Sequence, residues 1–188
     1  MPASPVPERS QRCGVEVAPL RREPADGAEQ VTQALRGELL QVTEQSEGWA
    51  RVVTAYGYPG WIRAEELCGD SPLEVARTFL GTPYEWGGLS ARGLDCSGLV
   101  HLAYRLCGQL VPRDAWQQDE AGAEVAEPEP GDLVTYGDPV DHVVFWAGEG
   151  RILHATGREG VRAVVEEPEP EALRLRRRRF VRLLLSPV

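Results

Sequence analysis

Cys96 is the residue of this sequence best placed to act as a nucleophile. It lies where a glycine-rich stretch, residues 87–93, gives way to an apolar run with helical spacing. Unpaired backbone N–H groups and the positive end of the helix dipole favour negative charge at a helix start, and they can lower the pKa of a cysteine placed there. We therefore expect Cys96 to be a thiolate.

Two histidines far downstream, His142 and His154, are candidate bases for this thiol. One cysteine with later histidine partners is typical of a cysteine nucleophile. A three-residue loop, residues 148–150, would set Ala147 opposite Arg151 and place both imidazoles on one face of a hairpin, at diagonal positions about 7 to 8 Å apart. A two-residue loop would point them to opposite faces. The glycines of the loop favour the longer form, and we expect His142 to be the imidazole nearer Cys96.

The other cysteines and the third histidine carry no such signal. Cys13, Cys68 and Cys107 fit core packing, because cysteine is among the most buried residue types. His101 lies five positions after Cys96, about 140° around the helix, and so should not join it. The four cysteines are scattered without the spacing of a zinc site, and we expect neither a metal nor a cofactor.

The composition excludes some classes of protein. The net charge of the 188 residues is −9 and every basic residue is an arginine, which argues against a nucleic-acid partner. One basic run, residues 174–182, could form a nucleic-acid patch, but the apolar residues that follow and interrupt it favour a terminal β-strand. Residues 1–11 form neither a secretory signal nor a membrane span, so we expect a cytoplasmic protein with no membrane partner and a flexible N-terminus.

The pattern along the chain predicts two domains. Between residues 12 and 70, short apolar runs alternate with turns, which indicates a small β-barrel. Ser71 and Pro72 can begin a helix over residues 73–80, and a second helix should run from Cys96 to about Cys107. Residues 71–188 then change to strands, at 132–136, 142–147, 151–156, 161–166 and the terminal apolar segment. Helices followed by an antiparallel sheet indicate an α+β fold with the helix of Cys96 packed on the sheet.

Several motifs of the second half resemble, in this order, the NlpC/p60 cysteine peptidases of bacterial cell-wall peptides: residues 83–88 (PYEWGG), 95–99 (DCSGL), 130–133 (PGDL), 141–143 (DHV) and 152–155 (ILHA). The resemblance implies a papain-like α+β fold and cleavage of the bond between the γ-carboxyl of D-Glu and a diamino acid. It also implies that Cys96 is the nucleophile, that His142 is the general base and that His154 orients His142. Tyr84 and Ser97 would line the oxyanion and substrate region.

The first half resembles a bacterial SH3-like domain through residues 48–49 and 57–62. Together with residues 112–115 (PRDA), this is similar to cytoplasmic γ-D-glutamyl-L-diamino-acid endopeptidases that recycle murein peptides. The resemblance implies that Asp114, Tyr58 and Glu23 bind the free amine of an N-terminal L-Ala. A desolvated ammonium needs such charge partners and acceptors. The alternative interpretation makes Asp114 a helix cap and Glu23 a solvated surface residue.

Three functions follow from these patterns. The first is a cytoplasmic enzyme that cleaves free murein tri- or tetrapeptides with an unblocked L-Ala. The second is an exported hydrolase of the intact wall, docked by its SH3-like domain. The third is an inactive scaffold that binds peptide, which the joint presence of Cys96, His142 and His154 disfavours. The patterns leave open the diamino acid and the oligomeric state.

Overall fold

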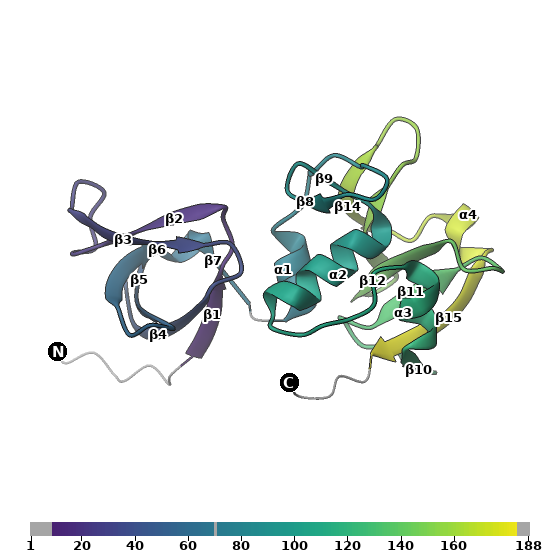
Figure 1. Ribbon diagram of the computed structural model, residues 1–188, viewed down its shortest axis with the longest axis horizontal. Helices are drawn as coiled ribbons and strands as arrows, with labels where there is room; N and C mark the ends of the chain where they lie inside the picture. Colours follow the sequence, from purple (N-terminus) through teal and green to yellow (C-terminus); the bar gives the residue numbers. More distant parts are fainter. Residues whose placement is uncertain (1–8, 70, 184–188) are drawn as a thin grey trace. The chain divides into compact units, whose positions relative to one another are not determined.

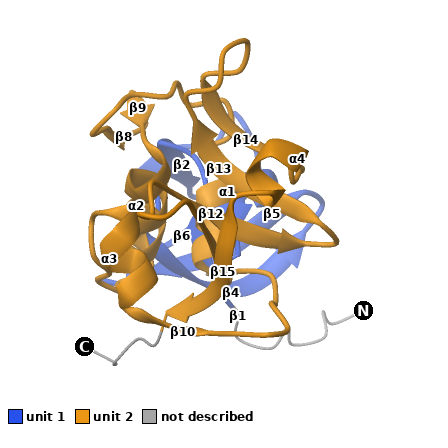
Figure 2. Ribbon diagram, turned by 90° about the vertical axis from the view of Figure 1, so that its right-hand side faces the viewer, with its two compact units in different colours: residues 1–70 blue, residues 71–188 orange. Residues whose placement is uncertain are grey.

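The computed structural model describes residues 9–69 and 71–183, which belong to two compact units that divide at Ser71 (Figure 2). The sequence places the domain boundary at the same residue. Each unit has its own sheet and its own buried core, so each is described by itself.

The N-terminal unit is a seven-stranded antiparallel sheet that curves into an SH3-like barrel, with strand order β3-β2-β6-β5-β4-β1-β7 (Figure 1). Small and branched apolar side chains, such as Ala18, Val42 and Ile62, fill its core. The elements are β1 (Arg9–Cys13), β2 (Val17–Arg21), β3 (Gln30–Leu35), β4 (Leu39–Ser46), β5 (Trp49–Thr54), β6 (Pro59–Arg63), the 3-10 helix η1 (Ala64–Glu66) and β7 (Leu67–Cys68).

The start of this unit differs from the prediction. Residues 9–11 were expected in a flexible N-terminus, but they belong to β1, where Arg9 pairs with Val42 and Gln11 with Leu40. Ladder pairing with β4 therefore overrides the polar composition of this segment. Residues 1–8 lie outside the described residues.

The C-terminal unit is an α+β domain, as the sequence predicts. Its six-stranded antiparallel sheet has the order β10-β15-β11-β12-β13-β14, and β8 and β9 form a separate two-stranded sheet. The elements are α1 (Pro72–Arg77), β8 (Leu89–Ser90), β9 (Gly93–Leu94), α2 (Cys96–Leu106), α3 (Ala115–Glu120), β10 (Gly122–Glu124), β11 (Leu133–Tyr136), β12 (His142–Gly148), β13 (Arg151–Thr156), β14 (Ala163–Pro168), α4 (Glu171–Arg174) and β15 (Arg177–Leu183).

Helix α1 begins as predicted and ends early. The Ser71 hydroxyl accepts a hydrogen bond from the Glu74 backbone N–H at 3.3 Å, and Pro72 occupies the first turn. The helix ends at Arg77 instead of reaching residue 80, because the next residues form a turn that closes at Gly81, whose φ is 82°. Glycine adopts this left-handed conformation at little cost.

Helix α2 packs on β12 and β13 of the sheet (Figure 1). Leu99, Val100 and Ala103 are buried, and the Tyr104 ring stacks on Phe145 at 6.1 Å between centroids. This packing places the first turn of α2 beside the strand that begins with His142.

The arginine run of β15 neutralises buried carboxylates. Arg179 Nε lies 2.9 Å from Asp119 Oδ1, and Arg182 Nε lies 2.7 Å from Asp132 Oδ1. Both carboxylates belong to buried residues, and a buried carboxylate is costly unless it is paired. The terminal strand is therefore confirmed, although Leu184 and Leu185 of the expected apolar segment lie outside the described residues. Within residues 9–69 and 71–183, no helix has the length and apolarity that crossing a membrane requires.

Replacing Arg179 should destabilise the C-terminal unit far more than replacing an arginine whose carboxylate partner is less buried. We expect Arg179→Gln to lower the free energy of unfolding by about 3 kcal/mol, because the buried Asp119 loses its bidentate partner and keeps only the longer ion pair, 3.4 Å, to Arg178 Nε. The control is Arg151→Gln, whose pair with Glu166 is 3.5 Å long and 42% exposed on the arginine side, and which should cost below about 1 kcal/mol. Urea unfolding followed by circular dichroism measures both, and equal losses would contradict this account.

Candidate active site

Cys96 is the first residue of α2 and is only 7% exposed. Asp95 precedes it as the N-cap, with extended backbone angles, and its Oδ1 accepts a hydrogen bond from the Gly98 N–H at 2.6 Å. An aspartate at this position satisfies a backbone donor that has no partner within the helix. The helix therefore starts at Cys96, as the sequence predicts.

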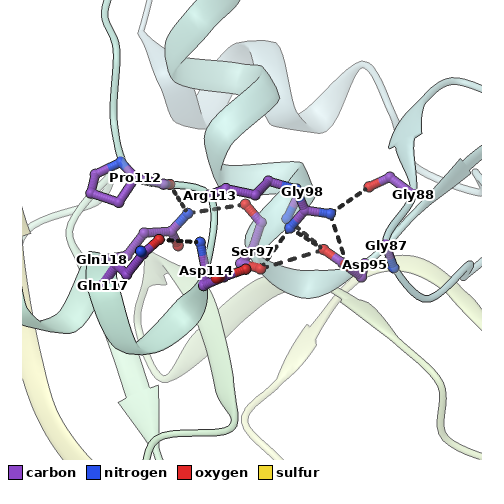
Figure 3. Close-up of polar contacts among 10 residues, drawn as sticks. All are labelled: Gly87, Gly88, Asp95, Ser97, Gly98, Pro112, Arg113, Asp114, Gln117 and Gln118. Atoms are coloured by element: carbon purple, nitrogen blue, oxygen red, sulfur yellow. Dashed lines mark hydrogen bonds and ion pairs between the residues drawn. The ribbon is translucent and has the colours of Figure 1, made fainter.

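The Asp95 carboxylate joins three segments of the chain (Figure 3). Its Oδ2 accepts from the Gly87 N–H at 2.7 Å, and both of its oxygens accept from the Arg113 guanidinium at 2.9 Å. Arg113 also donates to Ser97 Oγ at 2.9 Å and to the Gly88 carbonyl at 3.1 Å. A charge-assisted bidentate pair is geometrically specific. The loop before α2, the helix start and the segment before α3 are thereby fixed to one another.

Glycine is required where this loop approaches α2. A Cβ atom at Gly98 would collide with the Gly88 carbonyl oxygen, and a Cβ atom at Gly88 would collide with the Gly93 carbonyl. The glycines of this stretch thus permit a close approach of two backbones.

In the hairpin that carries His142 and His154, the two side chains lie on one face as predicted, but the turn that joins the strands differs from the prediction. Glu149 and Gly150 form a two-residue turn closed by Gly148 and Arg151, not the expected three-residue loop. A bulge between Trp146 and Gly148 absorbs one residue, which restores the expected register beyond it.

The prediction that His142 and His154 share a face is confirmed. Their rings meet edge to face, with 2.9 Å between His142 Nε2 and His154 Nδ1. His154 is 1% exposed, and its Nε2 lies 3.1 Å from Glu167 Oε1. Burial, together with the charges of His154 and Arg176, lowers the pKa of His142 to about 3, and burial also lowers the pKa of His154. Both imidazoles are therefore neutral near pH 7.

The expectation of a thiolate at Cys96 is wrong for the free protein. Burial raises the pKa of Cys96, and the neighbouring Asp95 carboxylate raises it further. Backbone hydrogen bonds, first among them that of Val143, favour the thiolate but do not offset the loss of water. Val143 directly follows His142, so the Cys96 sulfur lies against the main chain of the strand that carries the candidate base.

A hollow of about 600 Å³ opens beside Cys96 and has both aromatic and charged walls. Its lining includes Trp86, Ser97, Asp114, Trp116 and Asp141. Asp114 is the N-cap of α3, and its backbone N–H donates to Gln117 Oε1 at 3.2 Å. Asp114 is thus a helix cap and also an exposed carboxylate in the wall of the hollow.

Tyr84 lies near the thiol but lines a second hollow, which also contains His142 and shares Trp86 and Asp141 with the first. Burial raises the pKa of Tyr84, and the negative charge of a Cys96 thiolate would raise it further. The phenol is therefore protonated at neutral pH and can donate a hydrogen bond.

Tyr58 and Glu23 belong to the N-terminal unit, so their relation to Asp114 stays a prediction. Tyr58 is 43% exposed and lines a hollow of its own unit with Arg22 and Trp61. Glu23 is exposed next to Arg22, which interacts electrostatically with both Glu23 and Tyr58. The two candidates therefore lie at the same part of the barrel.

Sequence reasoning missed three residues of this site: Asp95, Arg113 and Glu167. An aspartate directly before an apolar helical run is an N-cap signal, so Asp95 could have been found. Arg113 lies in the PRDA run, but only the folded structure brings it to its partner Asp95. Glu167 has no local signal, because its contact depends on the pairing of β13 with β14.

His101 and Cys13 have structural roles, as predicted, whereas Cys68 and Cys107 are half-buried. His101 Nδ1 lies 2.8 Å from the Val111 carbonyl oxygen, and Cys13 is buried in the barrel core. Among the described residues there is no cluster of three or more potential metal ligands.

Both halves of the chain match known protein families. The NlpC/P60 family matches residues 81–175, which include Cys96, His142 and His154. The bacterial dipeptidyl-peptidase SH3 domain family matches residues 20–67.

Individual proteins are similar over part of their length. A probable endopeptidase of Corynebacterium glutamicum is 36% identical over 89 residues, which are 46% of this chain and 43% of that protein. A γ-D-glutamyl-L-lysine dipeptidyl-peptidase of Bacillus cereus is 30% identical over 128 residues, 58% of this chain and 38% of that protein. The chain thus spans less than half the length of these curated relatives. The crystal structure of an NlpC/P60 family protein from Bacillus cereus superposes on this chain with a TM-score of 0.59 at 24% sequence identity. The match covers 94% of this chain and 64% of that protein's chain, and it shows that the two share a fold.

The raised pKa of Cys96 predicts how its alkylation depends on pH. Only the thiolate reacts, so below the thiol pKa the rate should rise about tenfold for each pH unit. We expect the rate of iodoacetamide labelling of Cys96 to keep rising between pH 6 and pH 9, measured by mass spectrometry of the peptide that contains it. A constant rate from pH 5 to pH 8 would instead show a preformed thiolate–imidazolium pair.

Proposed function

Because this chain belongs to the NlpC/P60 family, we propose that it is a cysteine endopeptidase that cleaves the bond between γ-D-Glu and a diamino acid in free cell-wall stem peptides. The observation that carries the proposal is the meeting of α2 with the β12–β13 hairpin. That packing brings the Cys96 sulfur to the Val143 backbone, directly after His142, and His142 Nε2 is 2.9 Å from His154. A thiol, a base and a group that orients the base are the parts that covalent catalysis needs.

The proposed reaction starts from neutral groups and is completed in two steps. Cys96 attacks the γ-carbonyl of D-Glu while its proton passes to His142, so a C–S bond forms and the carbonyl electrons move to oxygen. Collapse of this intermediate breaks the C–N bond, and His142 gives the proton to the leaving amine. Water then attacks the thioester with His142 as base, which releases the acid and restores the thiol.

The Cys96 backbone N–H and the Tyr84 hydroxyl are the proposed donors to the oxyanion. The first backbone N–H groups of a helix lack partners within it, which suits a developing negative charge. Tyr84 supports this role because its phenol is protonated and interacts electrostatically with Cys96. Ser97 is bonded by Arg113 and lines the hollow beside Cys96.

The proposed substrate has an unblocked N-terminal L-Ala. Asp114 supplies an exposed carboxylate in the hollow beside Cys96, which suits an ammonium group. Tyr58 and Glu23, which lie at the same part of the SH3-like barrel, stay proposed as further residues that bind the ammonium. Such selectivity fits peptides released from the wall, so the proposal includes a role in murein recycling and a cytoplasmic location.

Substrate selectivity tests the proposal. We expect the full chain to release the diamino acid from L-Ala-γ-D-Glu-diamino-acid peptides, measured by chromatography with mass detection. Acetylation of the L-Ala amine should lower kcat/KM about a hundredfold, because it removes the charge that pairs with Asp114 while the bound substrate still takes water from this carboxylate.

Asp114→Asn keeps a capping side chain but removes the charge, and it should reduce this discrimination to about tenfold or less. The control is Glu120→Gln, which replaces an exposed residue of the same helix and should leave the discrimination between free and acetylated peptides unchanged. Equal kcat/KM for free and acetylated peptides in the unmodified protein would contradict the amine site and favour a hydrolase of the intact wall.

A further inference from the structure

The two histidines belong to a longer line of polar groups that ends at a carboxylate. His154 Nε2 lies 3.1 Å from Glu167 Oε1, and Glu167 Oε2 lies 2.8 Å from Arg158 Nη2. His154 pairs with Val165 in the β13–β14 ladder, so Glu167 is its diagonal neighbour on the same face. The register of the sheet thus places Glu167 beside His154, two residues along β14 from Val165, which lies directly opposite His154.

The charge of Glu167 determines where the protons of both rings lie. Its pairing with Arg158 and His154 lowers the pKa of Glu167, so its carboxylate only accepts hydrogen bonds at neutral pH. His154 Nε2 must then carry a hydrogen, and because that ring is neutral its Nδ1 is an acceptor. His142 Nε2 must therefore donate to His154 Nδ1 across the 2.9 Å contact. The lone pair of His142 is left on Nδ1.

We propose that Glu167 is a positioning residue that, through His154, fixes His142 in the tautomer whose Nδ1 is free to accept a proton from Cys96. Nδ1 is the ring nitrogen nearer the main chain, and the Cys96 sulfur lies at the backbone N–H that follows His142. The other tautomer would place a hydrogen on Nδ1 and remove the base. The catalytic part of this inference rests on the proposed function, whereas the tautomer does not.

The carboxylate also stabilises the charge that His142 gains in the reaction. The groups that face His142 are His154, the Tyr136 ring and the Arg176 guanidinium, which pairs with Asp141 at 2.6 Å. Arg176 opposes a positive imidazole, although Asp141 compensates part of its charge, and Glu167 favours the positive imidazole through His154. Arg158 compensates part of the charge of Glu167, which keeps this carboxylate ionised.

The neighbouring glutamate provides a matched control. Glu166 lies on the same strand as Glu167, but it pairs with Arg77 of α1 and Arg151 of β13 and makes no hydrogen bond to either imidazole. Glu166→Gln and Glu167→Gln therefore make the same chemical change at adjacent positions, and each removes a carboxylate from an arginine pair. Only the second reaches the histidines.

The tautomers can be measured without substrate by NMR of the ¹⁵N-labelled full chain, which has only three histidines. At pH 7 we expect both His142 and His154 as Nε2–H tautomers, and these should persist in Glu166→Gln. Glu167→Gln can either accept from or donate to His154, so it should yield a mixture. A wild-type His142 with its hydrogen on Nδ1, or unchanged tautomers in Glu167→Gln, would overturn the inference even if the protein is an active peptidase.

Kinetics test the consequence for the reaction. Glu167→Gln should lower kcat at least about tenfold with little change in KM, because a base in the wrong tautomer loses much of its contribution. Removal of the carboxylate lowers the pKa of the imidazole, so the acidic limb of kcat/KM should move to lower pH. Glu166→Gln should change neither quantity, and the same pH profile in both variants would refute a role beyond structure.

Discussion

The buried carboxylate of Asp95 is the constraint on which the candidate site depends. Asp95 is only 6% exposed and accepts from the backbone of Gly87, the backbone of Gly98 and the guanidinium of Arg113. A buried charge needs such partners, and their absence would cost several kcal/mol. The same contacts that satisfy the carboxylate fix the helix start, and so they fix the position of Cys96.

This arrangement has an electrostatic consequence for the thiol. The Asp95 charge and the loss of water both raise the pKa of Cys96, although a helix start by itself would lower it. The resting thiol is therefore neutral, and so is His142, because burial also disfavours its charged form. In the proposed reaction the charges then arise only as the proton passes from Cys96 to His142, which makes the orientation of the base more important than a permanent ion pair.

The sequence predicts those parts of the structure that local chemistry determines. Ser71 caps α1, Cys96 begins α2, and the two histidines face each other, as expected from their residue types and spacing. In the hairpin the two side chains share a face because a bulge compensates for the shorter turn. Beyond the turn the buried Phe145 pairs with the buried Leu153, and the turn adapts to this register. The prediction of a thiolate was wrong because a position at a helix start does not reveal how deeply the thiol is buried, and burial raises its pKa.

Contacts that tertiary structure creates could not be predicted in the same way. Glu167 meets His154 only through the register of β14, and Arg113 meets Asp95 across a gap of 18 positions in the sequence. Strand β1 was missed because its polar residues pair with β4 by backbone hydrogen bonds, which do not require apolar side chains. The family resemblance supplied the proposed reacting groups, whereas the groups that contact and position them required the structure.

The covalent intermediate is the most direct test of the central claim that Cys96 is the nucleophile. The full chain would be mixed with L-Ala-γ-D-Glu-diamino-acid peptide, quenched in acid within the first turnovers and mapped by mass spectrometry. The account predicts an L-Ala-D-Glu acyl group on Cys96, no acyl group on Cys13, Cys68 or Cys107, and neither adduct nor product in Cys96→Ala. Product formation by Cys96→Ala, or an acyl group on another residue, would contradict it.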